Sequence, residues 1–184
     1  METLQLRLLD LVIGGIHARL AKLWALIGLH LNADRITDNI WIGGLNSPRV
    51  ILSEGFNVVM DLREEATDDY RSSLENHGID YLNVKIPDRE GASTKLLSWI
   101  IKQIDERVQR GEKILIHCNL GRGRSALVAA AYLVSKNHEP EEAISLIKKK
   151  RRVTFLNNQQ KQALYEFANA LSSAHKCSEK DETG

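Results

Sequence analysis

A cysteine, two glycines and two arginines stand together in a stretch whose residue types and spacing suit chemistry on an anion. The stretch runs from His117 to Ser125 with the sequence HCNLGRGRS, after a β-branched apolar run that predicts a buried strand. A helical pattern begins near Arg124, and a helix N-terminus offers unpaired N–H groups and partial positive charge to an oxyanion. Two glycines let the backbone curl so that successive N–H groups face one concavity. These features predict a phosphate cradle with a sulfur atom at its floor.

The side chains of the stretch divide the expected chemistry among them. Nearby cationic groups and a helix N-terminus favour ionised sulfur, so we expect Cys118 to be a thiolate that attacks phosphorus in line. The planar fork of Arg124 matches two phosphate oxygens. The hydroxyl of Ser125 is placed to hydrogen-bond the sulfur and help it leave, and we expect His117 to brace the loop.

Each of these residues also has an ordinary structural explanation. A free cysteine after an apolar strand is commonly a small core residue, and arginines at a helix start are commonly solvated. The run from Gly121 to Ala126 also fits a dinucleotide fingerprint, which requires an acidic residue closing a second strand. The acidic residues downstream (Glu139, Glu141 and Glu142) precede a predicted helix instead, so the phosphate cradle is the better interpretation.

A phosphate cradle needs a proton source for the leaving group, and Asp88 is the candidate. It lies in the sequence IPDREG at the end of a predicted strand. A proline before it and a glycine after it suit a hinged loop that closes over the site. An aspartate after proline is also a common turn residue or helix cap, and Glu90 is the alternative acid.

The N-terminal segment, residues 1–32, is strongly apolar with helical spacing, so we expect a helix or a helix pair with a weak point at Gly14-Gly15. Charges interrupt every stretch long enough to span a membrane, and the segment is a poor secretory signal. Two interpretations stay open: a helix packed on the domain, or a helix at a membrane interface or against a partner.

The rest of the chain alternates strand and helix patterns. Strands are predicted at 40–42, 57–62, 81–86 and 113–117, and helices near 68–77, 94–110, 124–137, 140–150 and 158–174. This alternation predicts an α/β fold in which a short, largely parallel central sheet is flanked by helices. We expect one catalytic domain at 33–173 and a polar, disordered tail at 174–184.

Composition limits the classes of function. With 184 residues, 43% apolar residues and a net charge of +1, the chain fits one soluble domain without long-range attraction to nucleic acid or acidic membranes. Two cysteines, Cys118 and Cys177, give neither a disulfide framework nor metal-ligand spacing, although Cys177 could be a redox partner of Cys118. We expect an intracellular, cytoplasmic protein without metal or cofactor, and peripheral membrane contact stays open.

A basic run, KKKRR at residues 148–152, ends one of the predicted helices. One explanation is a solvated helix end favoured by the helix dipole. The other is a rim that attracts phosphorylated protein or anionic lipid. No aromatic residue interleaves with the run, so we expect no nucleic-acid partner.

The signature CxxxxxRS at 118–125 behind His117, with IPD at 86–88, resembles the dual-specificity class of protein tyrosine phosphatases. The similarity runs from residue 35 to residue 167. Within that class, the loop, DNIWIGGL at 38–45 and RVTFL at 152–156 resemble the branch that includes mitochondrial-type phosphatidylglycerophosphate phosphatases. That branch carries Lys-Ala after the cysteine and a longer acid loop, whereas this chain has Asn119-Leu120.

The resemblance implies a metal-independent phosphatase that acts through a phosphocysteine on Cys118, with Asp88 as acid and then base. The phosphate-binding residues it implies are Asn119, Leu120, Gly121, Arg122, Gly123 and Arg124. The substrate expected first is phosphoprotein, at tyrosine and at serine or threonine. Phosphatidylglycerophosphate or a phosphoinositide is the alternative, and a catalytically idle phosphate-binding module is a third interpretation.

Overall fold

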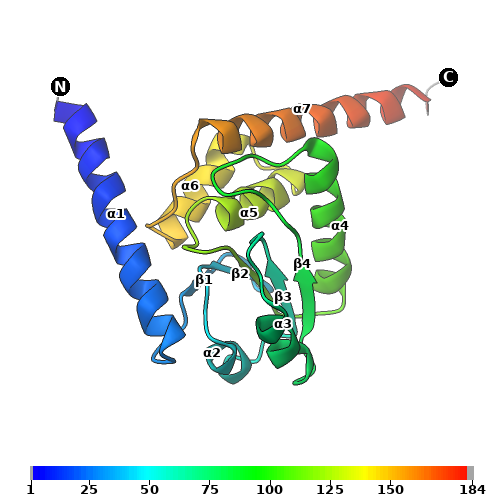
Figure 1. The fold of residues 1–184 in the computed structure, drawn as a ribbon. Coiled ribbons are helices and arrows are strands. Elements are labelled where there is room, and N and C mark those ends of the chain that lie inside the picture. The colour runs from blue at the N-terminus through cyan, green and yellow to red at the C-terminus, as the bar shows by residue number, and fades with distance from the viewer. Residues whose placement is uncertain (1, 182–184) are drawn as a thin grey trace.

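Five short strands form one central sheet in the computed structural model, which describes residues 2–181 and the side chains of residues 11–174. The strands are β1 (Ala33–Arg35), β2 (Ile40–Gly43), β3 (Val58–Asp61), β4 (Asp80–Asn83) and β5 (Ile114–His117). Their order is β1-β2-β5-β3-β4, and only β1 runs antiparallel to its neighbour. The predicted short, largely parallel sheet is therefore confirmed (Figure 1).

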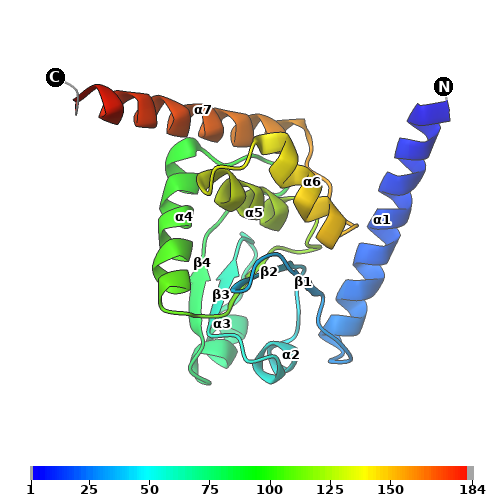
Figure 2. The same cartoon turned by 180° about the vertical axis from the view of Figure 1, so that it is seen from behind.

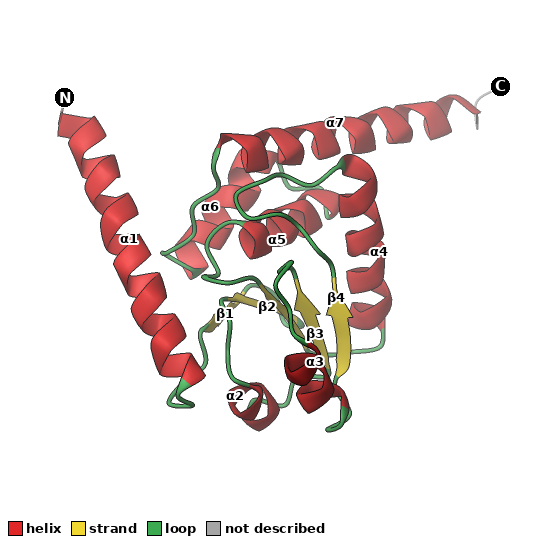
Figure 3. Ribbon diagram, viewed as in Figure 1, coloured by secondary structure: helices red, strands yellow, loops and turns green. Residues whose placement is uncertain are grey.

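Helices cover both faces of this sheet (Figures 1 and 2). They are α1 (Glu2–Leu26), α2 (Pro48–Ser53), α3 (Asp68–Glu75), α4 (Thr94–Gln109), α5 (Arg124–Ser135), α6 (Pro140–Lys150) and α7 (Asn158–Asp181). The larger core lies between the sheet and α4–α7, and a smaller core lies between the opposite face and α2 and α3. Helix α1 stands to one side, beside β1 (Figure 3).

The sequence of β5 explains why it lies in the centre. Ile114 and Ile116 point into the larger core, while Leu115 points into the smaller one. A parallel strand covered on both faces must be apolar on both, which is why this run does not alternate with polar residues. Its carboxyl end delivers His117 and Cys118 to the edge of the sheet where all parallel strands end.

The helix after β5 runs through the middle of the larger core. Every residue of α5 from Arg124 to Val134 is buried. Four alanines, Ala126 and Ala129–Ala131, let the neighbouring helices approach closely. The strand, loop and helix predicted around Cys118 therefore form one rigid unit whose ends are fixed in the core.

Four elements differ from the sequence-based expectation. Strand β1 and helix α2 were not predicted, because each is too short for a periodic pattern. Helix α7 continues to Asp181, so the tail predicted to be disordered from residue 174 is helical up to that point. Helix α1 is one continuous helix without a bend at Gly14-Gly15. In the described part of the chain, no helix has the length and apolarity needed to cross a bilayer.

Candidate active site

The loop between β5 and α5 directs its carbonyl groups away from its centre. All five carbonyls from Asn119 to Gly123 accept hydrogen bonds from groups outside the loop or from helix α5. The donors are Leu45 N (3.0 Å), Arg151 Nη2 (3.4 Å), Arg151 Nε (2.7 Å), Phe155 N (2.9 Å) and Leu127 N (2.8 Å), in the order of the loop residues. With every carbonyl held outward, the amide groups are left for the inside of the loop.

The N–H groups of the loop are the donors that the predicted anion site would use. The N–H of Gly121 donates to Cys118 Sγ at 3.3 Å. Within residues 2–181, no protein group accepts from the N–H groups of Asn119, Leu120, Arg122 and Gly123. Buried backbone amides are nearly always paired, so a ring of free ones calls for an anionic ligand.

Cys118 lies at the floor of a cavity of about 530 Å³ whose walls include this loop. The side chain is 3% exposed, and Ser125 Oγ lies 3.7 Å from the sulfur. The sulfur thus accepts one amide N–H and lies beside one hydroxyl group, contacts that a cysteine filling space in a core does not need.

Arg124 and Asp88 meet at the wall of the same cavity. The guanidinium group of Arg124 is 2% exposed and donates to the carbonyl oxygens of Ile86 (3.1 Å) and Leu62 (3.4 Å), which fix its plane. Its other terminal nitrogen lies 3.1 Å from Asp88 Oδ1, while the Asp88 side chain is 72% exposed on the rim. A bound phosphate must compete with this carboxylate for Arg124.

His117 is buried beneath the loop. Its Nδ1 lies 3.2 Å from the carbonyl oxygen of Cys118, which can only accept, so Nδ1 carries the proton. Its Nε2 lies 3.4 Å from the hydroxyl of Tyr70, which donates to it. Burial lowers the pKa of His117, so the ring is neutral, and its Nδ1–H donates to the backbone carbonyl group of Cys118.

A buried acidic group next to His117 was not anticipated from the sequence. Asp61 is fully buried and accepts from Arg63 (2.6 Å to Oδ2) and from the hydroxyl of Tyr81 (2.7 Å). Burial alone would raise the pKa of Asp61, but the Arg63 guanidinium and the hydrogen bond from the Tyr81 hydroxyl hold it below its ordinary value. This network fixes the carboxyl end of β3 beside the loop. Asp61 ends an apolar strand, but its partners Tyr81 and His117 are distant in sequence, so the strand pattern alone did not indicate this network.

Arg151 is the second group that sequence analysis missed. The basic run at 148–152 was explained as a solvated face or a charged rim, but Arg151 is 4% exposed and binds Gly121, Asp34 and Asn32. Gly121 has a φ of +69°, and a Cβ there would lie 2.4 Å from Arg151 Nη2. Any larger residue at position 121 would collide with Arg151, so glycine is required for Arg151 to pack against the outside of the loop. Of the remaining run, Lys148 and Arg152 line a neighbouring cleft.

The other candidates occupy different places. Arg122 turns outward and donates to the carbonyl oxygens of Val153 (3.0 Å) and Leu11 (3.1 Å), so its amide, not its guanidinium, faces the loop. Glu90 is exposed and does not line the cavity, whereas Gln160 does, although it was not predicted. The side chain of Cys177 lies outside the described side chains. Within residues 11–174, no group of histidine, cysteine and acidic side chains is arranged to hold a metal ion.

Comparison with known proteins connects this geometry to a family. Residues 45–170 match the catalytic domain of dual specificity phosphatases. The chain is 27% identical over 143 residues to a putative tyrosine phosphatase of Invertebrate iridescent virus 6, covering 77% of this chain and 95% of that one. It is 29% identical over 149 residues to phosphatidylglycerophosphatase and protein-tyrosine phosphatase 1 of Rattus norvegicus, covering 76% and 77%. The crystal structure of Tk-PTP in its active form superimposes with a TM-score of 0.69 at 29% identity, covering 75% and 97%.

Proposed function

Because this chain belongs to the family of dual specificity phosphatases, we propose that its phosphatase reaction runs through Cys118, Arg124, Asp88 and Ser125. The chain is a phosphoric monoester hydrolase. The observation that carries the assignment of residues is the set of four unpaired amides around a sulfur that already accepts the N–H of Gly121. A sulfur nucleophile inside a ring of donors suits phosphoryl transfer, because the three non-bridging oxygens of the phosphoryl group can all accept hydrogen bonds from the ring.

In the first step, the thiolate of Cys118 attacks phosphorus opposite the leaving oxygen. The S–P bond forms as the O–P bond breaks, and Asp88 donates its proton to the leaving oxygen. Arg124 and the amides from Asn119 to Arg124 hold the three remaining oxygens. Since Asp88 pairs with Arg124 in the free protein, phosphate binding releases the carboxyl group to face the leaving oxygen.

In the second step, a water molecule attacks phosphorus and the S–P bond breaks. Asp88 now takes the proton from the water, and phosphate leaves. The hydroxyl of Ser125, 3.7 Å from the sulfur, donates to the thiolate as it departs. The positive charge for both steps comes from Arg124 and the loop amides, so the proposed reaction needs no metal ion.

The first substrate class we propose is phosphoprotein, with hydrolysis at tyrosine and at serine or threonine. We expect turnover of a phosphotyrosine peptide and of a phosphothreonine peptide, and we expect EDTA to leave both rates unchanged. Phosphate release measured in parallel with phosphatidylglycerophosphate tests this. Turnover of the lipid without either peptide would reverse the order of the two substrate classes, and loss of all activity in EDTA with rescue by a divalent cation would reject the mechanism.

A phospholipid monoester is the second candidate, favoured by helix α1. Its outer face leaves large apolar side chains exposed, each by more than two fifths. They are Val12, Ile13, Ile16, Leu20, Leu23, Trp24 and Leu26, followed by Ile27 just past the end of the helix. Such a continuous apolar face is costly in water and is typical of helices that lie in a membrane interface. The rat relative's name joins both activities, phosphatidylglycerophosphatase and protein-tyrosine phosphatase.

Charged substitutions on this face test membrane contact. Ile16 and Leu23 are 51% and 55% exposed and lie two turns apart on one side of α1. Since burying one such side chain contributes about 1.5–3 kcal/mol, replacing both with glutamate should weaken binding at least about tenfold. Co-sedimentation with vesicles of phosphatidylcholine and phosphatidylglycerol measures it.

The matched control is Trp99→Glu, which changes an equally exposed apolar side chain (46%) on α4. We expect this variant to bind vesicles as the unmodified protein does. Equal vesicle binding by the α1 variant, or no binding by the unmodified protein, would exclude α1 as a membrane contact.

A further inference from the structure

Helix α1 forms part of the wall of the catalytic cavity, although it lies outside the matched family domain. Leu11 and Arg19 line the same cavity as Cys118. Two contacts hold the helix on the catalytic loop: Arg122 donates to the carbonyl oxygen of Leu11 at 3.1 Å, and Lys22 donates to Asn119 Oδ1 at 2.5 Å. The substrate group beyond the scissile phosphate must therefore pass α1.

Two guanidinium groups meet where α1 crosses the mouth of the cavity. A Cβ placed on Gly15 would lie 3.0 Å from Arg122 Nη1 and 3.7 Å from Arg19 Nη1, so both cations gather over this glycine. No carboxylate within residues 11–174 forms an ion pair with either arginine. Burial and the positive charge of Arg19 lower the pKa of Arg122. Two neighbouring cations that no described carboxylate neutralises form a favourable position for an anion.

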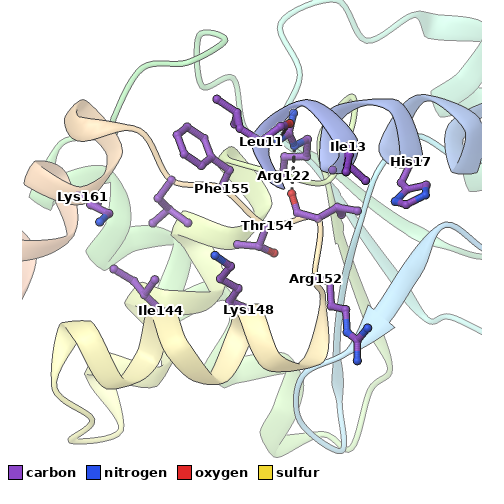
Figure 4. A pocket seen from close by; sticks show the side chains of 13 residues that line it. Leu11, Ile13, His17, Arg122, Ile144, Lys148, Arg152, Thr154, Phe155 and Lys161 are labelled. Atoms are coloured by element: carbon purple, nitrogen blue, oxygen red, sulfur yellow. Dashed lines mark hydrogen bonds between the residues drawn. The ribbon is translucent and has the colours of Figure 1, made fainter. Parts of the chain in front are cut away.

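The surroundings of the two arginines indicate which anion would reach them. A cleft of about 700 Å³ opens beside the catalytic cavity and shares Leu11, Arg122 and Phe155 with it (Figure 4). Basic side chains from α1, α6 and α7, among them His17 and Lys148, line the cleft together with apolar ones, and none of its lining residues is acidic. A ligand with a second anion and an apolar continuation matches this surface and the apolar face of α1, whereas an acidic peptide would leave that face unused.

We propose that Arg19 and Arg122 form a second anion subsite at the mouth of the catalytic cavity. It selects phosphate monoesters that carry a second phosphate group close to the scissile one, as a phospholipid headgroup does. The subsite rests on the proposed function, because the scissile phosphate must sit over Cys118 for the second to reach Arg19. Phosphate in this position also relieves the repulsion between the two guanidinium groups.

The test compares two substrates that differ by the second phosphate. The deacylated headgroup of phosphatidylglycerophosphate has a monoester and a diester, and glycerol 3-phosphate has the monoester alone. We expect Arg19→Gln to lower the ratio of kcat/KM for headgroup over glycerol 3-phosphate about tenfold to a hundredfold, the effect of losing one charged hydrogen bond. Arg19→Lys should restore part of the ratio. The intact lipid in mixed micelles should show the same loss as the soluble headgroup if the phosphate, and not the acyl chain, is recognised.

Arg49→Gln is the matched control, since Arg49 is an exposed arginine that forms no ion pair with any side chain of residues 11–174 and lines neither cavity. We expect this variant to keep the ratio. An unchanged kcat/KM ratio in Arg19→Gln overturns the subsite. A variant that loses only the preference for doubly over singly phosphorylated peptides, and keeps the preference for the headgroup over glycerol 3-phosphate, overturns it as well. If the unmodified protein hydrolyses neither the glycerophosphates and the lipid nor the phosphopeptides, the proposed function itself fails. That result differs from an unchanged ratio in an active enzyme.

Discussion

Replacing Cys118 with serine is expected to reduce kcat on para-nitrophenyl phosphate by about four to six orders of magnitude, the scale seen when an enzyme loses its nucleophile. A serine hydroxyl is not ionised at neutral pH, and nothing in the loop can deprotonate it, because the neighbouring groups are the N–H of Gly121 and the hydroxyl of Ser125. The amides and Arg124 are unchanged by the substitution. The variant should therefore still bind tungstate or inorganic phosphate, which calorimetry measures.

The control for this substitution is Cys177→Ser, the same chemical change at the only other cysteine of the chain. We expect full activity from it. Retained turnover in Cys118→Ser would reject the thiolate mechanism. Loss of both turnover and anion binding would instead mean that serine collapses the loop, and trapping of a radiolabelled phosphoenzyme in the unmodified protein would then decide whether Cys118 carries the phosphoryl group.

The catalytic loop could be predicted from sequence because its determinants are local. The apolar run before Cys118 specifies a buried strand, the pattern after Arg124 specifies a helix, and the glycines between them allow the turn. Asp88 was expected near the loop because it follows a predicted strand and lies between a proline and a glycine that suit a hinged loop. Nothing beyond neighbouring residues and the fold class was needed for these inferences.

The groups that brace the loop could not be predicted because their partners are distant in sequence. Arg151 reads as one of five consecutive basic residues, and only the return of the chain past β1 brings it to Gly121 and Asp34. The burial of Asp61 likewise depends on Tyr81 and His117 closing around it. In both cases, the charge pattern is ordinary and the tertiary contact determines the role.

Helix α1 shows a different limit of sequence analysis. Its apolar periodicity predicted a helix, and Gly14-Gly15 suggested a bend, since glycine weakens a helix by about 1 kcal/mol relative to alanine. In the structure the glycines instead leave room for Arg122, whose Nη1 lies 3.0 Å from where a Cβ of Gly15 would be. Local propensity alone does not distinguish a flexible point from a close contact.

Asp88→Asn is expected to slow hydrolysis of alkyl phosphates about a hundredfold to ten-thousandfold, the usual contribution of a general acid. With para-nitrophenyl phosphate, whose leaving group needs little protonation, the first step should lose much less. Steady-state kcat/KM, which reports the first step, measures this difference across a series of leaving groups. The same substitution removes the carboxylate that faces Arg124 at 3.1 Å. Inorganic phosphate should therefore inhibit the variant somewhat more tightly, by a factor kept small because Asp88 is 72% exposed.

These two effects have opposite signs, which separates an acid from a residue that merely positions the loop. Loss of the acid lowers kcat/KM in proportion to leaving-group basicity while phosphate binding improves, whereas damage to the loop lowers kcat/KM for every leaving group and weakens phosphate binding. Glu90→Gln is the matched control, since Glu90 lies two residues away but does not line the cavity. If Glu90→Gln acquired the leaving-group dependence and Asp88→Asn did not, the proton would come from Glu90. Asp88 would then only occupy Arg124 until phosphate displaces it.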